Sequence, residues 1–473
     1  MKTIKSILAL TGFGLLAASC GDFLQADLKG QYTSESFFIS AENAIAATTG
    51  VYNSLYGSTL WIFGDVASDD AVKGGNAGDQ ADINGINDFS AKADNGVLNT
   101  YWQNTYETVA RANNVIAYVP GIQMDQTLQK RLIAEAKFIR AYAYFNLVNI
   151  FGEIPLKLAP QNTSETIYVE LSTVPSVYTQ IEKDLLEAEA DLPVSYDMDH
   201  GRVTKGAALG LLAKVSLYQK KYNECLNFIQ TLENTGMYAL EDNYEDLFKS
   251  GAEDSYEVIF GIRYVDNDQV SLGNHLNVWF APSIEGGYYF NAPTQSYVDA
   301  FTEKTVDGME DPRLDASIGR DGEPWFNNTT YSASWSEATG YLVKKYNEDM
   351  ITGKAKAQSV IPYHAIRYAD ILLMKAEALN ETNQTQVAVT EVNKVRNRVH
   401  LSAVTSSSQS LLREIIRNER RKELGFEFHR FFDLMRWGRE VAEAALAPNL
   451  KWTEPRFYFP IPQSEIDTNH AIQ

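Results

Sequence analysis

The segment LLAKVSLYQKKYNECLNFIQTLENTG, residues 211–236, decides the fold class of this chain. Apolar side chains recur every three to four positions on both sides of a short polar turn, which predicts consecutive helices over residues 204–219 and 222–234. Ala213 and Cys225 stand twelve residues apart, and small side chains at these positions let two antiparallel helices approach closely, as in tetratricopeptide repeats. The segment therefore predicts a helical hairpin in which Cys225 packs, rather than acting as a nucleophile or metal ligand.

The same helical pattern extends through most of the chain, and strand-like alternation is scarce. Ala376 and Ala388 repeat the twelve-residue spacing. We expect a mainly α protein whose three or four tetratricopeptide-like hairpins form a right-handed helical scaffold. The predicted helices cover residues 40–56, 98–119, 126–150, 174–191, 204–219, 222–234, 366–380, 384–398, 408–424 and 428–446.

Two long regions interrupt the helices. Residues 68–99 are rich in Gly, Asn and Asp, and residues 257–363 combine many aromatics with short strand-like runs such as VIFGIRY and GYLVKKY. Long irregular segments in a compact domain are usually functional. We expect one domain over residues 20–473: an N-terminal helical part (20–256) with the 68–99 loop, a loop-rich ligand face (257–363) and a C-terminal helical part (364–473).

The N-terminus has the features of a bacterial lipoprotein signal. Lys2 and Lys5 precede a dozen apolar residues, too few to span a bilayer, and Leu16-Ala17-Ala18-Ser19 leads directly to Cys20. We expect residues 1–19 to be removed and Cys20 to carry acyl chains that tether the protein to a membrane. Removal takes away two lysines and no acid, so the formal net charge changes from -20 to -22. A charge of this sign repels nucleic acid.

The sequence contains no strong catalytic constellation. Six histidines are scattered without zinc-ligand spacing, and no nucleophile elbow or phosphate-binding loop is present. We therefore predict no catalytic residue, no metal and no cofactor. A pair of glycosidase carboxylates stays open as an alternative, because 61 acidic residues make chance pairs inevitable.

Aromatic residues crowd the second irregular region. Aromatic planes stack on the C–H faces of sugars while polar side chains bind the hydroxyl groups, so such a surface suits a neutral glycan in a pocket with few polar groups. The competing interpretation is that these rings pack the loops against the helices. The stacking candidates are Trp279, Tyr288, Tyr289, Trp325 and Trp335.

The stretch RNERRKELGFEFHRFFDLMRWG, residues 417–438, combines six basic residues with five aromatics. Four acidic residues balance the charge, and Arg with Glu or Asp at three- and four-residue steps predicts ion pairs partly buried against the core. We interpret the stretch as scaffold. Together with YHAIRYADILLMKAEALNE (363–381), AEAKFIRAYAYFNLVNIFGEIPL (134–156), GRVTKGAALGLLAKVSLY (201–218) and FYFPIPQSEID (457–467), it closely resembles the SusD/RagB family of outer-membrane nutrient-binding lipoproteins.

The resemblance implies a surface-exposed, non-catalytic lipoprotein of the outer membrane that binds oligo- or polysaccharide. It also implies a partner, a SusC-like TonB-dependent transporter that receives the glycan for uptake. Ligand contacts in the family lie in loops equivalent to the two irregular regions here, and from the first region we select polar candidates. These are Asp69, Asp70, Lys73 and Asn87.

Three other functions stay open. The same architecture binds peptides in RagB-like members, which abundant acidic loops would favour. A surface glycoside hydrolase would need two carboxylates about 5 to 10 Å apart in a cleft. An adhesin or structural repeat would have no pocket for a small ligand.

Overall fold

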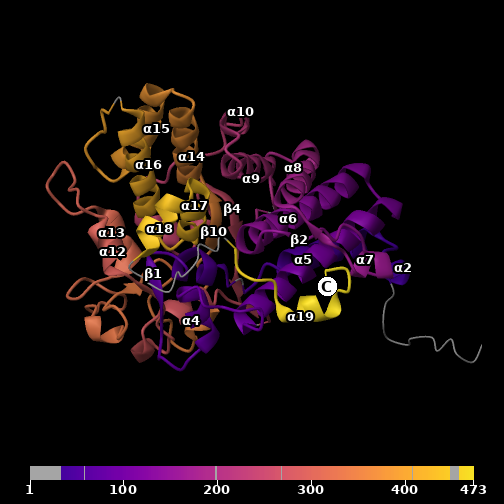
Figure 1. Cartoon of the computed structure of the whole chain (residues 1–473), viewed down its shortest axis with the longest axis horizontal. Helices are drawn as coiled ribbons and strands as arrows, with labels where there is room; N and C mark the ends of the chain where they lie inside the picture. Colours follow the sequence, from indigo (N-terminus) through magenta and orange to yellow (C-terminus); the bar gives the residue numbers. More distant parts are fainter. Residues whose placement is uncertain are drawn as a thin grey trace, which may run out of the picture.

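Long helices and a loop-rich region occupy different parts of the molecule in the computed structural model (Figure 1). The structure describes residues 34–57, 59–197, 200–267, 269–406, 408–447 and 458–472. The predicted signal segment 1–19 and the lipidation site Cys20 lie outside these residues. Within the described residues, no helix is long and apolar enough to cross a membrane.

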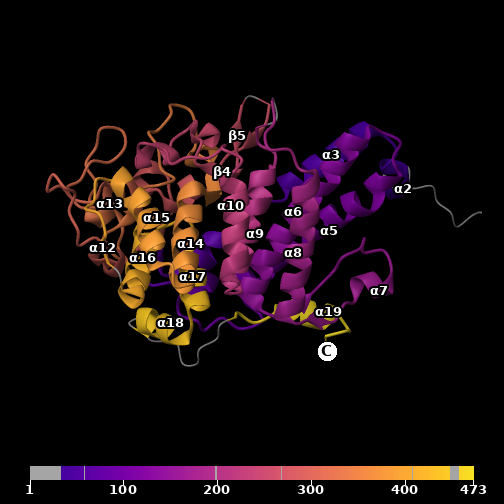
Figure 2. The same ribbon diagram turned by 90° about the horizontal axis from the view of Figure 1, so that it is seen from above.

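The helical scaffold is a series of antiparallel neighbours, each packed on the next: α5 on α6, α6 on α8, α8 on α9, α9 on α10, and α10 on α14, which also packs on α15 and α16. Figure 2 shows this row of helices side by side. Its long helices are α3 (Ala41–Asn53), α5 (Gly96–Tyr118), α6 (Gln126–Phe151), α8 (Val174–Asp191), α9 (Lys205–Tyr218), α10 (Tyr222–Glu233), α14 (Tyr368–Glu381), α15 (Thr385–Arg398) and α16 (Gln409–Glu423).

Shorter elements complete the fold. The short helices are α2 (Ser34–Phe37), α4 (Ala81–Asn87), α7 (Ser164–Ile167), α11 (Leu276–Phe280), α12 (Gln295–Asp299), α13 (Pro312–Ser317), α17 (Arg430–Trp437), α18 (Arg439–Leu446) and α19 (Gln463–Thr468), with a π-helix over Ile62–Val66. The strands are β1 (Ala71–Gly74), β2 (Ile154–Pro155), β3 (Leu171–Ser172), β4 (Val258–Ile262), β5 (Val265–Asp266), β6 (Ser271–Leu272), β7 (Phe290–Pro293), β8 (Ile318–Gly319), β9 (Leu342–Val343) and β10 (Tyr363–Arg367).

The mainly helical architecture is confirmed, and capping residues explain where several helices begin. The side chains of Asn95, Asp125, Thr173, Thr204 and Ser408 accept hydrogen bonds from backbone N–H groups in the first turns of α5, α6, α8, α9 and α16. Each cap satisfies a donor that the helix itself leaves unpaired.

The hairpin prediction for residues 211–236 holds in detail. Helices α9 and α10 pack against each other. Ala213 and Cys225 are fully buried, and so are Ala376 and Ala388 at the repeat of the twelve-residue spacing. Burial also raises the pKa of the Cys225 thiol, which keeps it protonated and unreactive.

Two helix predictions need correction. The helix predicted over residues 428–446 is two helices, α17 and α18, separated at Gly438, whose φ of 118° is a conformation that other residues rarely adopt. The helix predicted from residue 366 begins at Tyr368, because residues up to Arg367 pair with β4 as strand β10. Tertiary pairing overrides the helical pattern there.

The first irregular region is more ordered than its composition predicts. It contains β1 and α4, and Ile83 and Ile86 of α4 are buried and anchor it. Strand β1 pairs antiparallel with β7 of the second region, in the register Val72 to Ala292. The two irregular regions therefore form a single loop-rich part of the molecule.

Candidate ligand-binding site

A cavity of about 490 Å³ lies where the two irregular regions meet the helical scaffold. The π-helix and α4 supply one part of its wall, the start of α5 another, and Trp279 from α11 closes it. Residues far apart in the sequence thus contribute to one site. The lining residues are Thr59, Trp61, Ile62, Gln80, Ala81, Asp82, Ile83, Gly96, Val97, Thr100 and Trp279.

Trp279 is the predicted stacking residue that the structure places in this wall. Its partly exposed ring lies 5.8 Å from the ring of Trp61 and 5.4 Å from those of Tyr288 and Phe290. Edge-to-face packing of this kind fixes the orientation of an aromatic plane. Trp279 is therefore held rigidly by its neighbours while keeping surface for a ligand.

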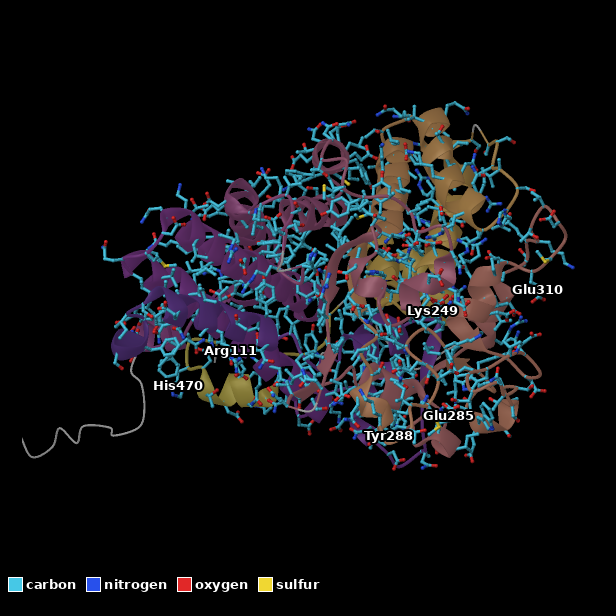
Figure 3. The ribbon with its side chains drawn as sticks, turned by 180° about the vertical axis from the view of Figure 1, so that it is seen from behind. Arg111, Lys249, Glu285, Tyr288, Glu310 and His470 are labelled. Carbon is cyan, nitrogen blue, oxygen red and sulfur yellow. The ribbon has the colours of Figure 1, made fainter. Side chains whose placement is uncertain are left out.

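Tyr288 extends this aromatic surface toward solvent. Its side chain is 50% exposed, although its backbone N–H is fixed by a 2.8 Å hydrogen bond to the Val278 carbonyl. Figure 3 shows Tyr288 and Glu285 on the loop-rich side, far from Arg111 on α5. An exposed ring on a fixed backbone costs little conformational entropy when a ligand packs on it.

Sequence reasoning missed Trp61, which is 1% exposed. Its indole Nε1 has no hydrogen-bond partner within the described residues, and buried polar groups are ordinarily paired. Trp61 lines the cavity, so an unpaired buried donor belongs to a residue of its wall. Trp61 precedes both irregular regions in sequence, so only the three-dimensional structure reveals that it belongs to the site.

The polar groups of the wall come from positions that the sequence did not single out: Thr59, Gln80, Asp82 and Thr100. Among the described residues of this wall Asp82 is the one charged side chain, and its Oδ2 accepts a 3.0 Å hydrogen bond from the Gly96 N–H. An ideal Cβ at Gly96 would lie 2.6 Å from that oxygen, so a larger residue there would displace the carboxylate. The cavity therefore presents aromatic and neutral polar surface with a single, engaged carboxylate.

The four polar residues predicted from the first irregular region lie elsewhere. Asp69 accepts hydrogen bonds of 2.8 and 2.9 Å from Arg430, and Asp70 accepts one of 2.6 Å from Arg421. Burial opposes ionisation of Asp69, but Arg430 and Arg421 outweigh it and hold its pKa below the ordinary value. Both carboxylates are thus buried and paired, which gives them a structural role in this conformation.

Lys73 and Asn87 also organise the first irregular region. Lys73 is 5% exposed, and its ammonium donates to the backbone carbonyls of Asn76, Ala77 and Asp79 at 2.9, 3.4 and 2.5 Å. Asn87 accepts a 3.1 Å hydrogen bond from the Lys73 N–H. The two residues hold the turn that leads to Gln80 and so support the cavity wall from behind.

The remaining predicted aromatics form a separate cluster. Trp325 is 5% exposed, lies 5.2 Å from Tyr331 and 6.2 Å from Trp335, and donates a 3.0 Å hydrogen bond to Glu285. Tyr289 packs against the same cluster. The structure therefore separates the stacking candidates: Trp279 lines the cavity, Tyr288 packs against Trp279, and three residues pack within the loops.

Comparisons with known proteins agree with this architecture. A scaffold of paired helices bearing an aromatic cavity on fixed loops defines a class of binding protein. One family model, described as SusD family, matches residues 256–452, and another, described as starch-binding associating with outer membrane, matches residues 22–217. The chain belongs to the SusD/RagB family.

Individual relatives resemble the whole chain. A SusD-like protein of Formosa agariphila is 28% identical over 499 residues, which covers 97% of this chain and 96% of the relative. A solved structure described as a laminarin binding SusD-like protein has a TM-score of 0.79 at 29% identity and covers 92% of this chain and 99% of that chain. A SusD-like carbohydrate binding protein from Bacteroides fragilis has a TM-score of 0.80 at 27% identity, covering 92% and 100%.

Proposed function

We propose that this protein binds a neutral oligo- or polysaccharide in the cavity of Trp279 without chemically altering it. The observation that carries the proposal is the fixed, partly exposed Trp279 ring beside neutral polar groups and the unpaired Trp61 indole N–H. Sugar rings offer C–H faces to aromatic planes and hydroxyl groups to such polar atoms. The glycan-binding descriptions of related structures add support.

The charge of the site favours a neutral ligand. The described wall contains no Lys or Arg that could pair with an acidic sugar, and its one carboxylate is engaged by Gly96. An anionic sugar would lose water on entering this cavity, and no cationic side chain of the described wall would offset that desolvation. A neutral saccharide pays no such penalty.

The same wall argues for binding rather than hydrolysis. Glycosidases place two carboxyl groups on either side of the scissile bond, about 5 to 10 Å apart. The cavity wall, as far as the chain is described, contributes Asp82 alone. We therefore propose a non-catalytic role.

We further propose that the protein acts in uptake. In this proposal Cys20 carries the lipid anchor, the protein sits on the exterior of the outer membrane, and a SusC-like TonB-dependent transporter receives the glycan. Support comes from the lipoprotein-like N-terminus and from the family description that includes association with the outer membrane.

Calorimetric titration with neutral oligosaccharides from laminarin, starch and xylan tests the binding site. We expect Trp279→Ala to weaken binding of the recognised glycan about tenfold, because a stacking surface is lost. Trp335→Ala, a matched change in the second aromatic cluster, should leave the affinity of the folded protein within about twofold. Equal affinities of wild type and Trp279→Ala would contradict the assignment, and binding of peptides instead of sugars would favour the RagB-like alternative.

A further inference from the structure

A second, longer groove lies on the scaffold outside the Trp279 cavity. It consists of two adjoining cavities of about 500 and 480 Å³. The first lies among β4, the turn before α9 and the segment after α10, and the second among β4, the same turn and α3. Figure 2 labels α3 and β4 in the view from above. The residues shared by the two cavities are His200, Gly201, Arg202, Asp254, Phe260, Gly261 and Arg263.

Exposed apolar side chains border this groove. Tyr256 is 75% exposed, Val194 is 41% exposed and Met237 is 40% exposed, and all three line the first cavity. Tyr52 of α3 and Leu55, just after that helix, line the second. Apolar surface gathered along a concave strip, instead of scattered singly, marks a binding surface.

His364 supplies an unpaired buried acceptor at the floor of the first cavity. The side chain is 1% exposed, and its Nε2 lies 2.7 Å from the Leu247 carbonyl, so Nε2 carries the proton and donates. Nδ1 then has a free lone pair, and no partner for it exists among the described residues. Burial lowers the pKa of His364 to about 4, which keeps Nδ1 an acceptor at neutral pH.

Gly261 leaves open the space beside this nitrogen. The space is narrow: an ideal Cβ at Gly261 would lie 3.2 Å from Val258 Cγ1, 3.4 Å from the Tyr363 carbonyl oxygen and 3.5 Å from His364 Nδ1. Gly261 lines both cavities. The missing side chain thus provides room next to an acceptor that lacks a donor. A hydroxyl group, directly or through one water molecule, is the complementary partner.

The charges of the groove are already compensated. Arg263 donates to Asp254 at 3.0 Å and to the Glu253 carbonyl at 2.6 Å, and Arg202 donates to Glu135 at 2.8 Å. Such paired arginines offer little net attraction to an anion. The groove therefore suits a neutral, hydroxyl-rich chain more than an acidic one.

Neighbouring stretches of the chain line the groove and the Trp279 cavity. Leu55 lines the groove and Thr59 lines the Trp279 cavity, only four residues further along the chain. Between the two, Tyr56 contacts the Tyr264 ring at 6.2 Å and shares a 3.0 Å hydrogen bond with His275, which directly precedes α11. Tyr56, next to the groove residue Leu55, is thus hydrogen-bonded to the residue that precedes the helix of Trp279.

We propose that this groove is a second saccharide-binding site that holds the continuation of a glycan chain whose other part occupies the Trp279 cavity. The inference rests on the proposed function. It assigns contact roles to Tyr256, as an exposed platform, and to His364, as a hydroxyl acceptor beside Gly261. It also predicts selectivity for long chains, because a short oligosaccharide reaches one site only.

Short and long members of the laminarin, starch and xylan oligosaccharide series test this inference by calorimetric titration of the full chain. We expect Tyr256→Ala and Gly261→Ala to weaken the binding of long chains about five- to tenfold, because each variant loses about one stacking or hydrogen-bond contact. The binding of short chains should stay unchanged. Gly261→Ala places a methyl group beside His364. Tyr168, directly after α7, is 39% exposed and lines none of these cavities. Tyr168→Ala is therefore the matched control and should change neither affinity.

The possible failures are distinguishable. Chain-length-independent binding that still depends on Trp279 would overturn the second site and leave the proposed function standing. Absence of saccharide binding to the wild type would contradict the proposed function and this inference together. An extended peptide that binds the wild type and loses affinity in Tyr256→Ala would overturn the assignment of the groove to a saccharide.

Discussion

Replacement of Glu423 by Gln tests the scaffold role of residues 417–438. Glu423 is fully buried and accepts charged hydrogen bonds from Arg398, from Arg367 at 2.6 Å and from Arg313 at 3.1 Å. Burial opposes its ionisation, but the three guanidinium groups outweigh this and lower its pKa far below the ordinary value. Glutamine keeps the shape, removes the charge and turns an N–H group toward these donors.

The expected cost follows from the burial of the cluster. Leaving buried charges without their partner costs about 3 to 5 kcal/mol, which multiplies the unfolding equilibrium constant more than about a hundredfold. Total stabilities of natural proteins are only about 5 to 15 kcal/mol, so the effect is large. We expect a clearly lower urea midpoint.

Glu414→Gln is the matched control on the same helix. Glu414 is 65% exposed and pairs with Arg417 at 2.8 Å, and exposed pairs of this kind contribute about 1 kcal/mol or less. Urea unfolding followed by circular dichroism compares both variants with the wild type. Equal midpoints for Glu423→Gln and Glu414→Gln would refute the scaffold assignment.

Three further predictions concern acid stability and the first irregular region. Burial lowers the pKa of His364 to about 4 and that of His429 to about 3, whereas unfolded histidine titrates near 6.5. As the pH falls, the unfolded chain therefore takes up protons before the folded protein does. We expect the free energy of unfolding to fall as the pH drops from about 6.5 to 4. A urea midpoint that stays constant over that range would contradict buried neutral histidines. Lys73→Met should expose the turn of residues 76–79 to limited proteolysis, because three backbone carbonyls lose their donor; unchanged cleavage would show that the lysine does not hold the turn. Asp69→Asn should lower the melting temperature, because it weakens the buried pair with Arg430, and should leave the glycan affinity of the folded protein intact. An unchanged melting temperature with a lower glycan affinity would instead indicate that Asp69 contacts the ligand.

The helical scaffold could be predicted because its signals are local. Helix-period spacing, capping residues and small residues at Ala213 and Cys225 act within a few turns of chain. The sequence also predicted that residues 417–438 form partly buried ion pairs, and Arg430 and Asp433 do lie in buried ion pairs. Their partners could not be predicted, because Asp69 lies 361 residues from Arg430 in sequence.

The site could be predicted only in part. Aromatic density pointed to Trp279 and Tyr288, but the same signal included Trp325, which packs inside the loops. Burial of a loop aromatic depends on which distant segment covers it, and that information is not local. Trp61 is the opposite case: it lies outside both irregular regions in sequence but lines the cavity. Its ring packs against those of Phe280 and Phe290.

A crystal structure of the protein with a bound neutral oligosaccharide tests the central claim most directly. The account predicts a sugar ring stacked on Trp279, within hydrogen-bond distance of the Trp61 indole N–H or the polar groups of the cavity wall. A saccharide bound with full occupancy elsewhere, with the Trp279 cavity empty, would contradict it.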